Sequence, residues 1–271
     1  MFNAPFGKAG SFYPAPLIKT DQTTQYSSEL DDGYYERGLA KSYTINTTGS
    51  QSGTSNVDLT HLISDTGAFT AADKTYTDAG KCGVFKAAGG ETVIITGSAS
   101  NNGTFTTASA TANTVVFVQA IVNEADAPMT TFQKRDAISN NTVLDNNTGL
   151  TWQRYTTSKF GAAGTGVMPW TGVDYDIFAY CAAANAAALG GQTDWRVPNF
   201  TELYTIFKWE QPYPYPDTTA FPSFAPSYVW TSTTLAADTT KAYFHRQNSI
   251  GDTGANTKTS SNYSCYLVRG G

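Results

Sequence analysis

The sequence predicts an α+β fold for the C-terminal half of the chain, and three features carry this prediction. The segment FAYCAAANAAALGG has apolar residues at helical spacing and ends in Gly190 and Gly191, which stop a helix. Short aromatic runs such as SYVWTST and SCYLVR have the composition of strands. Glycine and proline punctuate the stretches between these runs. We therefore expect short helices on one side of an irregular antiparallel sheet between Asp145 and Gly271.

Two helices are expected in this domain. The first spans roughly residues 175–189, and its inward-facing positions are Ile177, Phe178, Cys181, Ala184 and Ala188. The second begins near Asn199, where Asn199 or Thr201 would serve as the N-cap. Its inward-facing residues are Leu203, Ile206 and Phe207.

The strands of the domain are expected on either side of these helices. A turn at residues 145–149 leads into a strand that contains Leu150 and Trp152. After the long Pro-rich loop QPYPYPDTTAFPSF, strands are expected around residues 228–231, 242–246 and 263–269.

Two further parts precede this domain. Residues 1–40 read as an extended arm whose aromatic residues cannot be buried within the arm itself. Residues 41–135 predict a small all-β barrel or sandwich, and residues 136–271 form the C-terminal domain. The strand candidates of the β module are KSYTINTT, KCGVFKAA, ETVIITGSA, GTFTTASA and NTVVFVQAIV, with an Asn-Gly turn at Asn102 and Gly103.

Composition excludes several classes of function. Only 14% of the residues are charged, the net charge is −5, and no cluster of Lys and Arg forms a basic stripe for nucleic acid. No apolar run is long enough to span a membrane, and the N-terminus lacks the apolar region of a secretory signal. Three cysteines do not make a disulfide framework.

Catalytic residues are hard to assemble from this sequence. The two histidines, His61 and His245, lie in different predicted modules, and the carboxylates Asp194 and Glu202 belong to a cluster that we interpret as structural. No phosphate-binding, dinucleotide-binding or zinc-binding motif occurs. We therefore expect no enzyme activity and no cofactor. The pair Asp31 and Asp32 could form part of a calcium loop, but it lacks the alternating oxygen ligands of such a loop.

The motifs DNNTGLTWQR, TDWRVPNFTEL, VWTST and LVRGG, in this order, resemble the Lcl C-terminal domain family. The stretch LIKTDQTTQYSSELDDGYYERGLA resembles a leader that often precedes such domains. The resemblance implies a C-type-lectin-like fold, and it implies trimeric binding of sulfated polysaccharide, as in the adhesin that gives the family its name. It also implies a distant relation to formylglycine-generating enzymes, which use paired cysteines.

The sequence also marks a set of structural residues. Cys181 and Cys265 would form either a disulfide or two core thiols that link the first helix to the last strand. Trp195 would lie in the core, and Arg196 would bond a carboxylate or loop carbonyls. Trp152 would open the domain's first strand.

The terminal segment 238–266 is rich in Asn, Tyr, Ser and Thr, the composition of adaptable binding loops. Either it forms a polar hairpin that faces solvent, or it forms a ligand face. It also resembles the variable regions that retroelements diversify in phage and bacterial proteins. The candidate ligand-binding residues are Trp230, Tyr243, His245, Arg246, Asn248, Asp252, Asn256, Asn262 and Tyr263.

These observations predict a bacteriophage virion protein, either a tail-fibre or receptor-binding subunit or a capsid decoration subunit. The stretch SASNNGTFTTASATANTVVF resembles the small β modules of phage virion proteins. The arm would mediate self-association, expected as a homotrimer, and contacts with other virion proteins. The C-terminal domain would bind a glycan or protein of the host surface.

The alternative is a secreted or surface-bound bacterial adhesin that binds polysaccharide, for which Lys241, Arg246, Lys258 and Arg269 would have to cluster. A third class, an enzyme of the formylglycine-generating type, would require Cys181 and Cys265 to be reduced in an open cleft.

Overall fold

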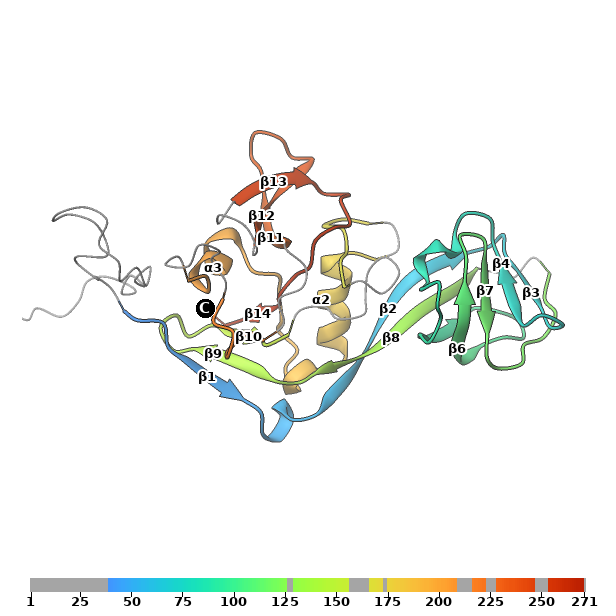
Figure 1. The fold of residues 1–271 in the computed structure, drawn as a ribbon, viewed down its shortest axis with the longest axis horizontal. Coiled ribbons are helices and arrows are strands. Elements are labelled where there is room, and N and C mark those ends of the chain that lie inside the picture. The colour runs from blue at the N-terminus through green and yellow to red at the C-terminus, as the bar shows by residue number, and fades with distance from the viewer. Residues whose placement is uncertain are drawn as a thin grey trace, which may run out of the picture.

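Figure 1 shows the computed structural model of the chain. It describes residues 39–125, 129–155, 166–172, 175–208, 216–222, 228–246 and 253–270. Almost all of the predicted arm, including the candidate calcium residues Asp31 and Asp32, lies outside the described residues.

The described part of the protein is mostly β. Strands make up 42% of these residues and helical segments 13%, arranged as three antiparallel sheets and two α-helices. The expected α+β, C-type-lectin-like class is therefore wrong. The two α-helices are present but span only ten and six residues, whereas the two longest strands span eleven and ten.

The largest sheet has seven strands in the order β2-β8-β5-β6-β7-β4-β3. In Figure 1, β2 and β8 form a long two-stranded ribbon that runs from the helices out to the other strands. We call the outer part, built on β3 to β7, the β lobe. The seven strands of the whole sheet are β2 (Thr54–Ser64), β3 (Ala68–Thr70), β4 (Thr75–Thr77), β5 (Thr92–Thr96), β6 (Gly103–Ala110), β7 (Thr114–Phe117) and β8 (Thr130–Ser139).

Three of the expected strands of the β lobe are confirmed, with β6 at its expected bounds. The expected strand KCGVFKAA is wrong, because Cys82–Val84 forms a 3-10 helix whose first N–H donates to the carbonyl of Ala112. Strands β2, β3, β4 and β8 were not expected. β5 ends at Thr96 and β6 begins at Gly103, so the connection between them is a wider loop and not a two-residue Asn-Gly turn.

A four-stranded sheet has the order β1-β9-β10-β14. β1 (Tyr43–Asn46) pairs with β9 (Thr142–Asp145), and β10 (Thr151–Gln153) pairs with both β9 and β14 (Val268–Arg269). Residues shortly after the arm therefore join the sheet of the C-terminal domain. The division of the chain at residues 40 and 135 stays a prediction.

The third sheet is formed by β11 (Tyr228–Thr234), β12 (Lys241–Arg246) and β13 (Thr253–Thr257). The strands expected near residues 228 and 242 are confirmed, and β13 was not expected. A bulge interrupts the pairing of β11 with β12 between Trp230 and Thr234.

Both expected α-helices are present. α2 (Ile177–Ala186) is capped by Asp176, whose side chain accepts bonds from two backbone N–H groups. α3 (Phe200–Thr205) begins at Asn199, where a complete capping box confirms the expected N-cap. Two inward-facing assignments are wrong, because Phe178 is 39% exposed and Ala188 is also exposed, with φ 48°. The short 3-10 helices are Gly49–Gln51, Cys82–Val84 and Leu189–Gly191.

Three apolar clusters form the core. One lies in the β lobe, and the other two lie in the C-terminal domain, one around α2 and one around α3 and the four-stranded sheet. The expected inward-facing residues Leu203, Ile206 and Phe207 are all buried. The β2–β8 ribbon connects the clusters, since Phe132 of β8 belongs to the β-lobe core and Ile138 to the α2 core.

Candidate functional site: an open depression beside α2

An open depression of about 530 Å³ lies in the C-terminal domain. One wall is α2, the second is the segment that leads into α3, and the third is the bulge of β11. The lining residues are Phe178, Cys181, Ala182, Asn185, Trp195, Arg196, Val197, Asn199 and Ser232.

The floor of the depression is held rigidly by hydrogen bonds from α2. The Asn185 side chain clamps the backbone of Trp195, accepting from its N–H at 2.7 Å and donating to its carbonyl at 2.8 Å. The Cys181 thiol donates to the same carbonyl at 3.1 Å. The indole N–H of Trp195 donates to the carbonyl of Leu189 at 2.9 Å, which fixes the ring in the core. The shape of this wall is therefore set without a ligand.

The guanidinium of Arg196 is engaged within the domain. It donates to both carboxylate oxygens of Glu202 at 2.6 Å and to the carbonyl of Gly270 at 2.9 Å. Burial alone would raise the pKa of Glu202, but hydrogen bonds from Arg196 and from the Asn199 N–H outweigh it and lower the pKa. The sequence predicted both partner types for Arg196. Its charge is neutralised at the edge of the depression.

The rim presents an aromatic ring and open polar groups. Phe178 packs edge-on against Trp170, with ring centroids 4.7 Å apart, and Trp170 is fixed by a 2.8 Å bond from its indole N–H to the Thr231 carbonyl. Among the described residues, no hydrogen bond uses the hydroxyl of Ser232 or the side-chain NH₂ of Asn199. The depression thus combines a supported, partly exposed aromatic ring with free donors and acceptors.

Three residues of the predicted ligand face lie in the core instead. Trp230 and Tyr263 are 0% and 4% exposed and stack with their centroids 4.0 Å apart. His245 is buried against Phe200, whose carbonyl lies 3.2 Å from Nε2, and burial lowers the pKa of His245 to about 4. None of these three side chains is placed to touch a ligand in this structure. The aromatic residues of a Tyr- and Asn-rich segment were needed for packing.

Of the other predicted ligand-binding residues, Tyr243, Arg246 and Asn256 are partly accessible. Tyr243 is half-buried against Phe200, and the guanidinium of Arg246 lies over the ring of Tyr228 at 5.3 Å. Asn256 donates to the hydroxyl of Tyr263 at 2.7 Å, and Asn262 is exposed. The remaining two residues, Asn248 and Asp252, lie outside the described residues.

The predicted structural residues are all in supporting positions. Trp152, Trp195, Cys181 and Cys265 are buried. The two cysteines are free thiols, which agrees with the core-thiol alternative rather than the disulfide. Burial raises the pKa of Cys181 to about 11 and raises that of Cys265 well above its usual value, so neither thiol is activated as a nucleophile.

The four basic residues considered for an anionic ligand are each engaged locally. Lys241 pairs with Asp238 at 3.0 Å, and Arg269 pairs with Asp194 at 2.6 Å. Lys258 lies over the ring of Trp170 at 4.0 Å, and Arg246 lies over Tyr228. Two of the four charges are thus neutralised by carboxylates and two rest on aromatic rings.

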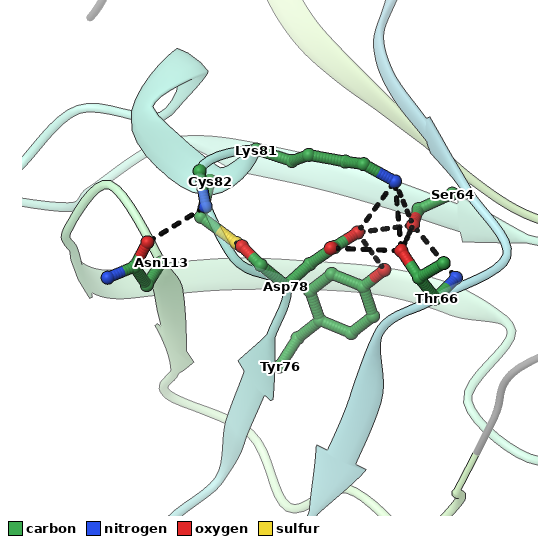
Figure 2. A network of polar contacts seen from close by, with 8 residues as sticks. Ser64, Thr66, Tyr76, Asp78, Lys81, Cys82 and Asn113 are labelled. Carbon is green, nitrogen blue, oxygen red and sulfur yellow. Dashed lines mark hydrogen bonds and ion pairs between the residues drawn. The ribbon is translucent and has the colours of Figure 1, made fainter.

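A second cluster of polar side chains lies in the β lobe, and Figure 2 shows it. Asp78 accepts hydrogen bonds from the hydroxyls of Ser64, Thr66 and Tyr76, the last two at 3.1 and 3.3 Å. Lys81 reaches the same carboxylate at 3.5 Å and also donates to Ser64 and Thr66. Burial would raise the pKa of Asp78, but the hydroxyl bonds and Lys81 lower it. The network is closed on itself and ties two strands together, so we interpret it as structural.

Within the described ranges, no three His, Cys, Asp or Glu side chains come together in a way that could hold a metal ion. In the same part of the chain, no helix combines the length and apolar character needed to cross a membrane.

Comparison with known proteins concerns the domain that contains the depression. Residues 141–269, just under half of the chain, match the model of the Lcl C-terminal domain. This segment is similar to the Lcl C-terminal domain, and we call it the Lcl domain. The predicted family is thereby confirmed over these residues, and the match indicates a lectin-like or surface-binding role. No curated protein and no solved structure matches the chain.

Sequence reasoning missed the residues that make the depression accessible. Phe178 was assigned to the core because it falls in an apolar run at helical spacing, yet Asp176 caps α2 so that Phe178 turns outward. Asn199 was recognised only as a helix cap, and Ser232 was not singled out. A large aromatic residue next to a run of alanines was the one signal in the sequence that could have pointed to Phe178.

Proposed function

We propose that this protein attaches to a host surface by binding a neutral glycan in the depression of its Lcl C-terminal domain. The observation that carries the proposal is the open depression itself, in which exposed Phe178 adjoins the unused polar groups of Ser232 and Asn199. The family match supports a surface-binding role for the domain that contains it.

The chemistry of the depression favours a sugar ring. The C–H face of a pyranose packs against an aromatic ring, while its hydroxyls bond to groups that both donate and accept, such as serine and asparagine. Val197, Ala182 and Cys181 supply an apolar floor. Because Glu202 neutralises Arg196, the depression offers no free cation to a sulfate or carboxylate. We therefore expect a neutral ligand rather than an anionic polysaccharide.

Binding without catalysis fits the state of the nucleophilic groups. The imidazole of His245 is buried, with a pKa lowered to about 4. The two thiols of the domain are buried with raised pKa values, which counts against an enzyme of the formylglycine-generating type.

The proposed setting is a bacteriophage virion, in a tail fibre, a receptor-binding subunit or a capsid decoration. The β lobe projects from the Lcl domain at the end of the β2–β8 ribbon (Figure 1). The segment before residue 41 would anchor the subunit through self-association, expected as a trimer, and through other virion proteins. A secreted or surface-bound bacterial adhesin with the same binding domain is the alternative setting.

Removal of residues 1–40 tests the setting. If the full chain forms regular oligomers by mass photometry and the truncated chain is a folded monomer, the segment is an assembly device and the virion setting gains support. If the full chain is monomeric, a self-assembling virion subunit is excluded and the adhesin becomes the better proposal.

A glycan array tests the binding function. The full chain should bind neutral hexose-containing glycans, and Phe178→Ala should reduce that binding at least about tenfold, as expected when one aromatic contact is lost. Tyr204→Ala is the matched control, since Tyr204 is 42% exposed on α3 of the same domain but does not line the depression. Equal binding by both variants, or binding confined to sulfated glycans, would overturn the proposal.

A further inference from the structure

A second cavity, independent of the depression, lies where the β lobe meets the Lcl domain. It has a volume of about 290 Å³ and is more enclosed than the depression. Residues from β2, β5, β8 and the segment before β5 line it: Asn56, Lys86, Gly89, Gly90, Glu91, Thr92, Lys134, Arg135, Asp136 and Ala137.

The cavity exists because β5 stops pairing with β8. The last paired residues are Thr92 and Arg135, and the chain before them turns away through Gly89 and Gly90, whose φ angles are +67° and +80°. The edge of β8 beyond Arg135 therefore has no strand beside it on this side. This explains why residues from both faces of β8, such as Asp136 and Ala137, line the same cavity. A Cβ atom on Gly90 would meet no atom within 4 Å, so the space beside this glycine is open.

The wall of the cavity carries a buried polar layer between two apolar cores. Along the inward face of β8, Phe132 belongs to the β-lobe core and Ile138 to the α2 core, while Lys134 and Asp136 lie between them. These two charged side chains are only 3% and 2% exposed. Lys134 is compensated by Glu91 at 3.0 Å and by the Val84 carbonyl at 2.6 Å. Apolar side chains of the same volume would join the two cores, and the protein would be at least as stable as it is with this buried ion pair.

Among the described residues that line the cavity, the accessible charge without a carboxylate partner is that of Lys86. Lys86 is exposed and the side chain of Arg135 is 35% exposed, whereas Glu91 and Asp136 are only 11% and 2% exposed. Arg135 uses Nε and Nη2 to bind Asp58, so its remaining Nη1 is not used by this pair. Asp58 neutralises Arg135 as Glu202 neutralises Arg196, so Lys86 supplies the unpaired positive charge at the opening and Nη1 of Arg135 supplies a further N–H donor.

We propose that the junction cavity is a second binding site, which takes a small carboxylate such as an acidic monosaccharide. Lys86 and Arg135 bind the carboxylate at the opening, and the side chains of Asn56 and Thr92 bond the hydroxyls of the ligand. Since β2, β5 and β8 all contribute to its wall, an occupied cavity links the β lobe to the strands that enter the Lcl domain. This site does not depend on the glycan proposed for the depression.

Isothermal titration calorimetry on the full chain tests this site, with D-glucuronate and D-galacturonate as probes. D-glucose and D-galactose are their uncharged counterparts. We expect a Kd of about 1 mM in low salt, so each probe is used at about 10 mM. At least one carboxylate should bind and its uncharged counterpart should not. Lys86→Gln should weaken binding about tenfold, and Ala137→Leu, which fills the cavity, should abolish it.

Two control variants make the test specific. Lys74→Gln removes an exposed lysine elsewhere in the β lobe, and Thr131→Leu places the same side chain on the same face of β8 outside the cavity. Both should bind as the unaltered chain does. The proposal is overturned if no carboxylate binds, if the uncharged counterparts bind equally, or if Ala137→Leu binds as well as Thr131→Leu. Glycan binding by the depression should be unchanged in all four variants.

Discussion

The β lobe and the Lcl domain use their polar side chains in different ways. In the β lobe, Asp78 is 5% exposed and its carboxylate is bonded by three hydroxyls and a lysine (Figure 2). In the Lcl domain, the hydroxyl of Ser232 and the side-chain NH₂ of Asn199 face an open depression and are not bonded by any described residue. Closed networks hold strands together, whereas polar groups left open beside an exposed ring are available to a ligand. The junction cavity combines both, with a compensated ion pair inside and the exposed cation of Lys86 at its opening.

The largest expected effect concerns the ion pair of the junction. Lys134→Met leaves Glu91 buried without its cation, so the free energy of unfolding should fall by about 4 kcal/mol. The double variant Lys134→Met, Glu91→Gln should recover most of this loss, because it leaves no buried carboxylate without its cation. Urea denaturation of the three proteins checks this. A double variant as unstable as the single one would mean that the pair is needed for stability.

The next effect concerns the closed network of the β lobe. Asp78→Ala leaves three buried hydroxyls without their acceptor, so we expect a loss of about 3 kcal/mol in denaturant unfolding. Asp73→Ala is the control, because Asp73 is exposed in the turn between β3 and β4 and should change stability by less than about 0.5 kcal/mol. Similar losses in both variants would contradict the role given to the network.

A smaller effect is expected from pH, through the two buried histidines. Burial lowers the pKa of His61 to about 3 and that of His245 to about 4, against about 6.5 in the unfolded chain. At a pH between the folded and unfolded pKa values, the unfolded chain binds more protons than the folded chain. The free energy of unfolding therefore falls as the pH falls below about 6.5. Between pH 7 and pH 5, each histidine should lower the free energy of unfolding by about 1–2 kcal/mol, which thermal or urea unfolding measures. His61→Gln and His245→Gln should each flatten this dependence, and an unchanged slope in both would contradict the burial argument.

The smallest effect on stability is expected at the depression. Phe178→Ala removes a ring that is 39% exposed, so the free energy of unfolding should change by no more than about 1 kcal/mol even though glycan binding is lost. Thermal unfolding of Phe178→Ala and Tyr204→Ala side by side checks this. A loss of several kcal/mol would mean that Phe178 belongs to the core, as its helical spacing first suggested.

Local signals in the sequence were sufficient for the elements that are set by local chemistry. The alternation in GTFTTASA predicted β6 at its observed bounds, and Asn199 followed by Glu202 marked the start of α3. The family motifs located the Lcl domain, including Trp195 in the core and Arg196 on a carboxylate and a carbonyl.

Elements set by tertiary contacts were not predictable in this way. β8 carries Lys134 and Asp136 on its inward face, so its alternation of apolar and polar residues is hidden. In β2, the register shifts at His61, which interrupts the period of two. The balance between helix and sheet was misjudged for this reason, because the two longest strands of the structure carried no clear pattern.

Three residues of the predicted ligand face are buried, and composition could not show this because it does not say which way a side chain points. Tyr, Asn and Ser in the terminal segment suggested a ligand face, but β12 packs Phe244 against the α2 core and buries His245 against α3. Trp230 and Tyr263 fill the space between the sheet and α2. The open site lies instead where α2, the start of α3 and the β11 bulge meet, and only the fold brings these three segments together.

Photo-crosslinking with a diazirine-bearing neutral glycan, followed by mass spectrometry of the labelled peptides, tests this placement most directly. Our account predicts labels on the peptides that contain Phe178, Asn199 and Ser232, and loss of labelling in Phe178→Ala but not in Tyr204→Ala. Labels confined to Tyr243 and residues 253–262 would place the ligand on the terminal face and contradict the account.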